Sequence, residues 1–399
     1  MSQLEHNNNV LIREITPRNI LSFGPETAPL ELGSLNVFIG PNGSGKSNFI
    51  DLLALLRATP NDMRAVTRRG GGVREWIWKG DPDATASLDV LVDNLYHPFD
   101  VENLRHTFAF GAIGQAFNLQ DEQIAYEKNM PTASLRPDPL YQYKHGRPVV
   151  NIKGEQRELE PESVEPDLSI LAQRRGAESY PEISYLADRY EQIRIYREWS
   201  FGRDSLLRNP QQTDMRNDRL EEDFSNLGLY LSRLRKDAKT KRAIIGALAD
   251  LYSGFTDFEV ITEGGTVQVF FIEGDFSIPA SRLSDGSLRY LILVALLCDP
   301  APAPLICIEE PELGLHPDIL PKLADLLVSA SERTQLIITT HSDILVDALS
   351  EHPEAVIVCE KHDGQTTMRR LEPEKLAVWL EKYTLGQLWT RGELGGTRW

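Results

Sequence analysis

A glycine-rich stretch near the N-terminus has the residue types and the spacing that hold phosphate. Residues 40–47 are Gly-Pro-Asn-Gly-Ser-Gly-Lys-Ser, which fits the pattern GxxxxGK[ST]. Glycines let such a loop curl until its backbone N–H groups point at phosphate oxygens, and a following helix adds partial positive charge. In that chemistry Lys46 reaches the β- and γ-phosphates and the Ser47 hydroxyl holds Mg²⁺. We predict a nucleotide site formed by Gly40, Pro41, Asn42, Gly43, Ser44, Gly45, Lys46, Ser47 and Asn48.

Two adjacent carboxylates, Glu309 and Glu310, follow the apolar segment 305–308. Carboxylates at the end of a buried strand are costly unless a cation or proton chemistry uses them. Because side chains alternate along a strand, the two are expected on different sides of it. One of them can bind Mg²⁺ while the other orients an attacking water. A solvated strand end is the alternative interpretation.

Two further motifs lie downstream of the glycine loop. His341 follows the apolar segment 336–338 and is expected at the C-terminal edge of a sheet, where open α/β folds bind ligands, so we predict that it contacts the γ-phosphate. Ser284 and Gly286 precede the apolar segment 288–298. Serine is a good helix N-cap, and glycine lets a ligand approach the backbone closely. Taken alone, this second motif is also explained by an ordinary capped core helix.

These residues need strands and a helix to position them. Residues 35–39 form an apolar segment directly before the glycine loop, and 48–57 have the periodicity of a helix directly after it. The segments 305–308 and 336–338 are short apolar runs typical of buried strands. The sequence therefore predicts an α/β fold, and the strand–loop–helix context is the one that a P-loop NTPase requires.

The order of the four motifs resembles that of the ATP-binding-cassette (ABC) ATPases, within the soluble RecF/SMC/OLD-like branch. The stretches that carry the resemblance are GPNGSGKSN (40–48), LSDGSLR (283–289), IEEPELGLHP (308–317) and TTHSD (339–343). By this resemblance Lys46 and Ser47 are Walker A residues, Ser284 and Gly286 belong to the signature motif, and His341 is the switch histidine. Glu309 takes the Walker B magnesium position, where many members have aspartate, and Glu310 that of the general base. The implied catalytic residues are Glu310, His341 and Lys46, and the implied metal ligands are Ser47 and Glu309.

The resemblance also implies ATP and Mg²⁺ as cofactors and a dimer as the ATP-bound form. Two heads would close on two ATP molecules, with the P-loop of one head facing the signature motif of the other. Since the chain has one set of motifs, a homodimer or a larger even-numbered oligomer is expected. The C-terminal segment resembles the ends of compact stand-alone ATPases, many of them from bacterial defence loci. The predicted function is a switch in DNA metabolism, repair or phage defence that regulates a separate effector, such as a nuclease.

We expect three parts in the chain. Residues 1–160 would form the N-terminal part of the head, with an antiparallel β-layer from 84–127 and a loop over 128–160. Residues 161–256 would form a mainly helical insertion, a lid or arm that includes a short strand at 193–197. Residues 257–399 would complete the head, beginning with hairpins that turn at 264–265 and 274–275. The insertion lacks the heptads of long SMC arms.

Four other segments have weaker signals. Six cations between 233 and 242 can form a stripe for DNA or a partner, with a solvated helix face as the alternative: Arg233, Arg235, Lys236, Lys239, Lys241 and Arg242. The segment from Arg68 to Gly72 can touch phosphate or be a mobile loop, and Gln173 is the candidate for the Q-loop glutamine. Glu360 ends a strand-like segment as a nuclease metal ligand would, but no DxD follows it, so an ordinary strand is favoured.

Composition limits the class of protein. The chain has 399 residues, 41% of them hydrophobic, and 42 basic against 59 acidic side chains, which gives a net charge of −17. This excludes wholesale disorder and argues against a surface coated with basic charge for nucleic acid. No apolar run has the roughly 18–20 residues of a membrane helix, and Cys298, Cys307 and Cys359 form no CxxC pair, so a reducing cytoplasm is expected. The alternatives are a transporter's nucleotide-binding subunit, a scaffold that binds ATP without hydrolysis, or a self-contained nuclease.

Overall fold

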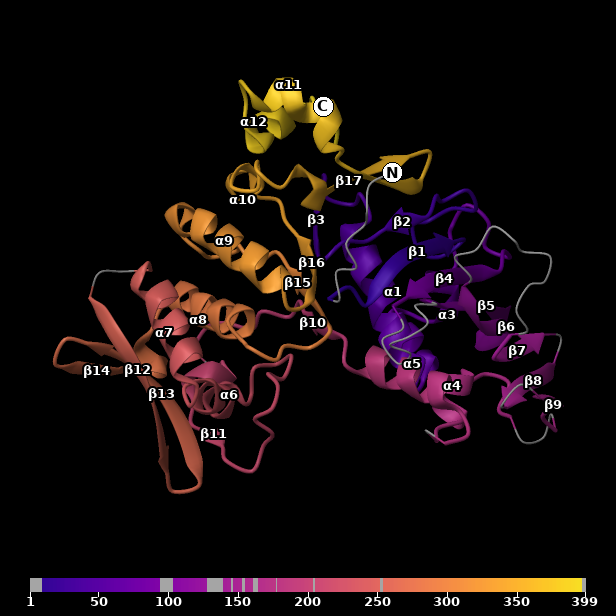
Figure 1. The fold of residues 1–399 in the computed structure, drawn as a ribbon, viewed down its shortest axis with the longest axis horizontal. Helices are drawn as coiled ribbons and strands as arrows, with labels where there is room; N and C mark the ends of the chain where they lie inside the picture. The colour runs from indigo at the N-terminus through magenta and orange to yellow at the C-terminus, as the bar shows by residue number, and fades with distance from the viewer. Residues whose placement is uncertain are drawn as a thin grey trace.

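In a computed structural model, the described part of the chain forms three sheets and two hydrophobic cores (Figure 1). The structure describes residues 9–93, 103–127, 139–144, 146–152, 155–160, 164–176, 178–203, 205–251 and 254–396. No helix in this part of the chain is long and apolar enough to cross a bilayer.

A mainly parallel sheet lies at the centre of the molecule. Its order is β10 (Arg194–Tyr196), β15 (Leu305–Glu309), β16 (Gln335–Thr339), β3 (Leu35–Ile39), β17 (Val356–His362) and β18 (Gln365–Arg370). All neighbours run parallel except β18, which is antiparallel to β17. The residues of β3 and β16 are buried throughout, as expected for strands covered on both faces. The sheet therefore brings the carboxyl ends of β3, β15 and β16 to one edge.

An antiparallel sheet of eight strands covers one side of this centre. Its order is β2 (Leu30–Glu31), β1 (Ile12–Arg18), β4 (Ala86–Val92), β5 (Asn103–Ile113), β6 (Ala116–Glu127), β7 (Tyr141–Lys144), β8 (Arg147–Ile152) and β9 (Glu155–Glu158). Helix α1 (Lys46–Ala58) shares one core with this sheet and one face of the parallel sheet. Most of its apolar side chains are buried, because strands of both sheets and the helices α2 (Met63–Arg69) and α5 (Pro181–Glu191) share the core with it.

The prediction of a loop over residues 128–160 is wrong for residues 141–158, which contain three strands. Strands β7, β8 and β9 continue the antiparallel layer by successive hairpins. Only alternate residues of β7 and β8 are buried, for example Tyr141, Tyr143 and Val150, so polar residues occupy the other face. Strands this short and polar give little periodic signal in the sequence. Residues 128–138 lie outside the described part of the chain.

The second core lies on the opposite face of the parallel sheet. Helix α8 (Asp285–Leu297) is at its centre and packs with α6 (Leu227–Leu234), α7 (Ala238–Ala249) and α9 (Leu320–Ser331). A small sheet of β11 (Gln211–Gln212), β12 (Phe255–Glu263), β13 (Thr266–Glu273) and β14 (Phe276–Pro279) borders these helices. Its hairpins turn at Gly264–Gly265 and after Gly274, as predicted.

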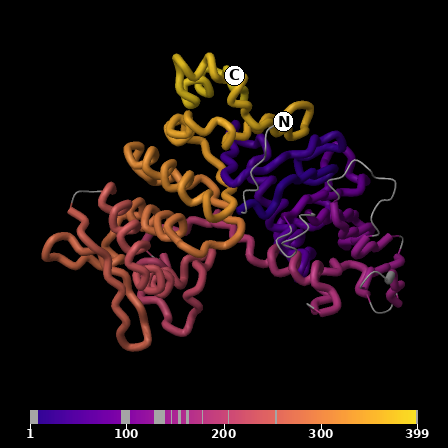
Figure 2. The backbone as a smooth tube through the Cα atoms, in the orientation of Figure 1, coloured from indigo at the N-terminus to yellow at the C-terminus, as the bar shows by residue number. Residues whose placement is uncertain are grey.

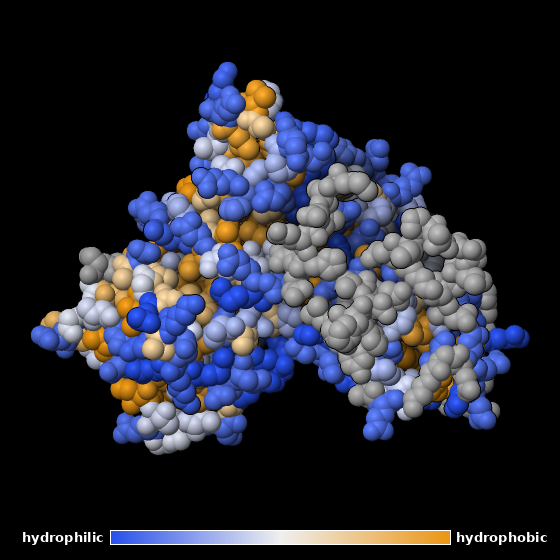
Figure 3. Space-filling view, viewed as in Figure 1, coloured by the Kyte–Doolittle hydropathy of each residue, from blue (hydrophilic) through white to orange (hydrophobic). Residues whose placement is uncertain are grey.

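The remaining helices are short. They are α2 (Met63–Arg69), α3 (Val73–Trp76), α4 (Ile170–Gln173), α5 (Pro181–Glu191), α10 (Asp343–Asp347), α11 (Pro373–Leu380) and α12 (Leu385–Thr390). In Figure 3 the visible face is mostly hydrophilic, with an apolar area over the C-terminal helices at the top. Among the residues of α11, Val378 and Trp379 are exposed.

Between α5 and α6 the chain runs from the core of α1 to the core of α8, and in Figure 2 this stretch of the backbone crosses from right to left. Helices α4 and α5 belong to the core of α1, β10 joins the central sheet, and α6 and α7 belong to the core of α8. The part predicted as an insertion therefore contributes to both cores. The boundaries at 160/161 and 256/257 stay predictions.

Candidate nucleotide site

The loop between β3 and α1 has the geometry of a phosphate cradle. Gly40, Gly43 and Gly45 have φ angles of 146°, 79° and 103°, which L side chains rarely adopt. A Cβ on Gly40 would lie 2.2 Å from the backbone oxygen of Cys359, and one on Gly45 would lie 2.2 Å from the Thr366 hydroxyl. These close approaches explain why the loop needs glycine. No atom of the described residues lies within 4 Å of a Cβ built on Gly43, so this part of the structure leaves that side of the loop open.

Two polar groups of the loop are suited to an anion. Lys46 is only 6% exposed, and its Nζ donates to the backbone oxygens of Gly40 (2.8 Å) and Pro41 (3.1 Å). The Oγ of Ser44 is buried without a hydrogen-bond partner among the described residues. Burial lowers the pKa of Lys46, and the nearby carboxylates oppose that effect. A phosphate would satisfy both groups, so the loop fits the ligand that its sequence predicts.

Glu309, the last residue of β15, faces the first turn of α1. The Ser47 hydroxyl donates to its Oε1, and Arg197 Nε donates to its Oε2 at 3.1 Å. The indole nitrogen of Trp199 donates to its backbone oxygen at 2.9 Å. A serine hydroxyl and a carboxylate in contact are the hard oxygen ligands that Mg²⁺ prefers. The proposed metal ligands are therefore neighbours.

Glu310 turns away from Glu309 and toward the histidine. Its Oε1 lies 3.4 Å from Nε2 of His341, and its backbone N–H donates to the Thr339 oxygen at 3.0 Å. Glu310 has a φ of 47°, the left-handed region that residues other than glycine rarely adopt. Such strain persists only where the surroundings fix it, and it often occurs at functional sites.

A third carboxylate, Glu312, belongs to the same cluster and was not predicted. Its Oε1 accepts from the Thr340 hydroxyl (2.7 Å) and from the His341 backbone N–H (2.8 Å). Its Oε2 is buried without a hydrogen-bond partner among the described residues. Burial raises the pKa of Glu312, and the two hydrogen bonds act against that rise. Glu312 thus fixes the start of the segment that carries His341.

Arg289 of α8 also reaches this cluster. It is buried, and it donates to the backbone oxygen of Glu310 at 3.2 Å. Its guanidinium lies 4.6 Å from the ring centre of Trp199 and 5.0 Å from that of Phe201. Burial lowers the pKa of Arg289 to about 10. An arginine within an otherwise apolar helix was the sequence signal for this contact.

The signature residues lie at the other core. Ser284 is the N-cap of α8, and its Oγ accepts from the backbone N–H of Ser287 at 3.0 Å. A Cβ on Gly286 would lie 2.7 Å from the backbone oxygen of Gly314, in the turn after β15. Among the described residues, no hydrogen bond or ion pair joins the side chain of Ser284 to the P-loop. The structure therefore brings Lys46, Ser47, Glu309, Glu310 and His341 to one edge, with Ser284 and Gly286 elsewhere on the same chain.

Gln173, the Q-loop candidate, closes its own loop. It exchanges hydrogen bonds with the backbone of Glu165 and donates to the oxygen of Leu168 at 2.8 Å. Gln173 therefore does not face Glu309. Arg197, directly after the strand β10 beside β15, does face Glu309. Glu360 lies on β17 and accepts from the backbone N–H of Gly396 at 3.0 Å. The described residues contain no cluster of three or more side chains suited to hold a metal.

Three of the six cations between 233 and 242 pack against or pair with other residues of the chain. Arg233 pairs with Asp299 at 2.6 Å and Lys241 with Asp257 at 2.7 Å, while Arg235 stacks over Phe258. These three help to hold α6 and α7 in the second core. The other three, Lys236, Lys239 and Arg242, are exposed. Only these three side chains are available for the predicted contact with DNA or a partner, and that contact stays a prediction.

Comparison with known proteins agrees with this geometry. The curated relative "Chromosome partition protein Smc" of Mycolicibacterium paratuberculosis (strain ATCC BAA-968 / K-10) is 33% identical over 96 residues, which are 23% of this chain and 8% of that protein. The crystal structure of an SmcHead bound to the C-winged helix domain of ScpA matches with a TM-score of 0.60 and 15% identity, covering 92% of this chain and 99% of the other. The Smc head domain with an extended coiled coil from Pyrococcus furiosus, bound to the C-terminal domain of ScpA, matches with a TM-score of 0.55 and 15% identity. This match covers 93% of this chain and 99% of the other.

These likenesses show the fold, and the predicted α/β P-loop head of the SMC-like ABC type is confirmed. The chain spans only a small part of the length of the curated relative. A family model described as "AAA domain, putative AbiEii toxin, Type IV TA system" matches residues 35–347, which include all four motifs. The chain belongs to this family of AAA domains and has the fold of an SMC-head-like ABC ATPase.

Proposed function

We propose that this chain is a Mg²⁺-dependent ATPase whose ATP-bound form is a head-to-head dimer. The observation that carries the proposal is the meeting of a phosphate-type loop, the Ser47–Glu309 pair and the Glu310–His341 pair at one edge of the parallel sheet. Membership of the AAA domain family supports nucleotide binding.

Each residue has a chemical task in this proposal. Lys46 and the loop N–H groups hold the phosphates, and Ser47 with Glu309 would hold Mg²⁺. The metal, when bound, neutralises charge on the phosphate oxygens. Glu310 orients and deprotonates the attacking water, and His341 contacts the γ-phosphate from the neighbouring strand end. The carboxylates of Glu309 and Glu310 face different partners, Ser47 and His341, so one can serve the metal and the other the water.

The dimer follows from what a single chain leaves incomplete. Ser284 is exposed at the N-terminus of α8, a 13-residue helix whose first N–H groups suit an anion. Two apolar side chains close in sequence to the catalytic glutamate and the histidine, Leu313 and Ile344, are 50% and 38% exposed. A second copy placed head to head would cover this face and set its Ser284 and Gly286 against the γ-phosphate. ATP would then join the two chains, and hydrolysis would release them.

The biological role that we propose is a switch in DNA metabolism, repair or phage defence, acting in the cytoplasm on a separate effector. Matched SMC heads are bound to ScpA, which supports a protein partner for a head of this fold. DNA, if it binds, would contact Lys236, Lys239 and Arg242.

The dimer is tested with Glu310→Gln, which keeps the size of the side chain and removes the base. We expect ATP binding to persist, phosphate release to fall on the order of 100-fold or more, and the variant to elute as a dimer with ATP. Lys46→Ala should stay monomeric. A Glu310→Gln variant that binds ATP yet remains a monomer would rule out the head-to-head form. Normal ATP binding by the wild type without any Lys46-dependent phosphate release would favour the scaffold alternative.

A further inference from the structure

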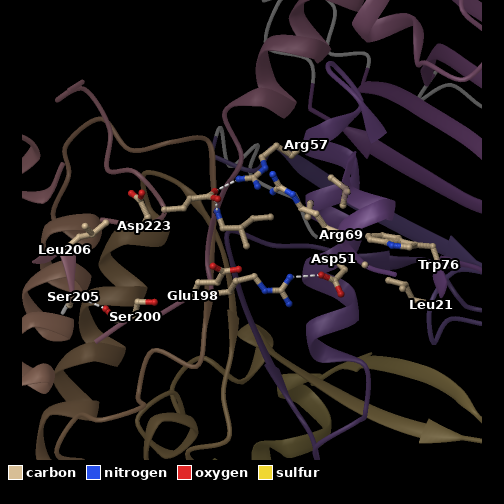
Figure 4. Close-up of a pocket in the computed structure, with 16 residues that line it drawn as sticks. Leu21, Asp51, Arg57, Arg69, Trp76, Glu198, Ser200, Ser205, Leu206 and Asp223 are labelled. Carbon is tan, nitrogen blue, oxygen red and sulfur yellow. Dashed lines mark hydrogen bonds and ion pairs between the residues drawn. The ribbon is translucent and has the colours of Figure 1, made fainter. Parts of the chain in front are cut away.

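Arg197 joins the helix of the P-loop to the carboxylate at the end of β15. It lies directly after β10, the strand beside β15. One terminal nitrogen of its guanidinium is 2.6 Å from Oδ1 of Asp51 on α1, and its Nε is 3.1 Å from Oε2 of Glu309. Figure 4 shows Asp51 at the wall of a pocket of about 730 Å³, with this ion pair drawn as a dashed line.

The two oxygens of Glu309 are held by different elements. Oε1 takes the Ser47 hydroxyl from α1, and Oε2 takes Arg197 from the end of β10. Asp51 lies four residues after Ser47, one helical turn along α1, so Arg197 is anchored to the helix that presents Ser47. The planar guanidinium, with its fork of donors, is suited to bridging two carboxylates in a fixed geometry.

The chain around Arg197 holds the backbone of Glu309 as well. Trp199, two residues later, donates its indole N–H to the Glu309 oxygen, and Arg289 stacks against its ring. The segment 197–199 therefore forms hydrogen bonds with both the side chain and the backbone oxygen of Glu309. A glutamate has one more rotatable bond than the aspartate common at this position, so it needs more support to present one oxygen in one place.

We propose that Arg197 is a positioning residue for the metal ligand Glu309: it holds Oε2 so that Oε1 faces Ser47. This inference rests on the proposed function, because Ser47 and Glu309 are metal ligands only there. The guanidinium does not occupy the place of the cation, since it contacts Oε2 while Ser47 contacts Oε1. Burial acts to lower the pKa of Arg197, but Asp51 and Glu309 outweigh it and raise that pKa, so the support stays charged.

The test measures metal affinity apart from turnover. Mn²⁺ is titrated by electron paramagnetic resonance into wild type, Arg197→Ala and Arg197→Lys, each saturated with ADP. ADP affinity is measured separately in EDTA. Loss of an outer partner of a metal ligand typically costs about 10–100-fold in affinity, so we expect that increase in the Mn²⁺ Kd for Arg197→Ala, with ADP affinity in EDTA unchanged. Arg197→Lys should restore part of the loss and serves as the test if the alanine variant fails to fold.

Arg57→Ala is the matched control. Arg57 lies on α1, lines the same pocket as Arg197 and pairs with Glu222. Its side chain is 30% exposed, against 31% for Arg197, and its ion pair is with Glu222 and not with Glu309. Its Mn²⁺ Kd should equal that of the wild type. An unchanged Kd in the Arg197 variants would overturn the inference, and a tighter one would show that Arg197 competes with the cation. If wild type binds no ADP, the proposed function itself fails.

Discussion

At the scale of single residues, the site concentrates acidic side chains and strain in a few positions. Glu309, Glu310 and Glu312 lie within four residues, and each faces a different partner: Ser47, His341 and the backbone of the histidine segment. Such a cluster is unfavourable without cations, and Lys46, Arg197 and Arg289 supply positive charge beside it. Of these three cations, Lys46 was predicted as a site residue, whereas Arg197 and Arg289 were not.

Glu312 gives this scale a pH test. Its pKa lies above the ordinary 4.5 because of burial, so the folded state binds its proton more tightly than the unfolded state does. Its contribution to stability therefore falls as pH rises from 4.5 through the folded pKa. The side chain of Glu312→Gln cannot ionise, so the variant does not lose this contribution. The free energy of unfolding of the variant minus that of the wild type, both measured in urea without nucleotide or metal, should therefore increase as pH rises over this interval. Parallel pH profiles for the two proteins would contradict the assignment.

At the scale of elements, the start of α8 contacts the turn after β15, and this contact links the proposed signature residues to the strand that carries Glu309. Gly286 allows this contact, because the oxygen of Gly314 occupies the place of a Cβ. The oxygen belongs to the backbone, so it cannot rotate away as the end of a flexible side chain would. A larger residue must therefore move α8 or the turn.

Two glycines in helices should respond oppositely to alanine. Gly286→Ala meets the Gly314 oxygen and should lower the free energy of unfolding by about 1–3 kcal/mol, as overpacking does. Gly246→Ala in α7 is exposed, with nothing within 4 Å of the new Cβ, and should gain up to about 1 kcal/mol from helix propensity. Chemical denaturation of both variants measures the difference. Equal effects would mean that the contact at Gly314 is not tight.

At the scale of the whole molecule, the two cores divide the proposed site between them. The P-loop helix α1 belongs to one core and the signature helix α8 to the other (Figure 1). In a head-to-head dimer each composite site would take Lys46 from one chain and Ser284 from its partner. Two symmetric sites would follow from an isologous interface.

This division predicts complementation between two inactive variants. Lys46→Ala and Ser284→Arg should each lack ATPase activity. A mixed dimer contains one site in which both residues are intact, so an equimolar mixture should recover phosphate release, up to about half of the wild-type rate if every chain enters a mixed dimer and the sites act independently. Each variant alone, at the same total concentration, is the control. No recovery, with mixed dimers demonstrated by differently tagged chains, would contradict shared sites.

The sequence by itself determined the local chemistry and the class of fold. The P-loop, the Glu309–Glu310 pair, His341 and the capped helix after Ser284 are each written in a few neighbouring residues, because loop geometry, strand alternation and helix capping are short-range. The strands β7–β9 escaped prediction, since strands of four to six residues are too short for an alternating pattern to stand out from the sequence around them.

Only the tertiary structure decided which charges meet. Arg197 is 146 residues from Asp51 and 112 from Glu309, and the partner of Arg233 is 66 residues away. Contacts over such separations depend on how the two cores pack on the central sheet, which local spacing does not encode. For the same reason only the folded chain shows that half of the basic stripe serves packing and that Arg197 supports Glu309.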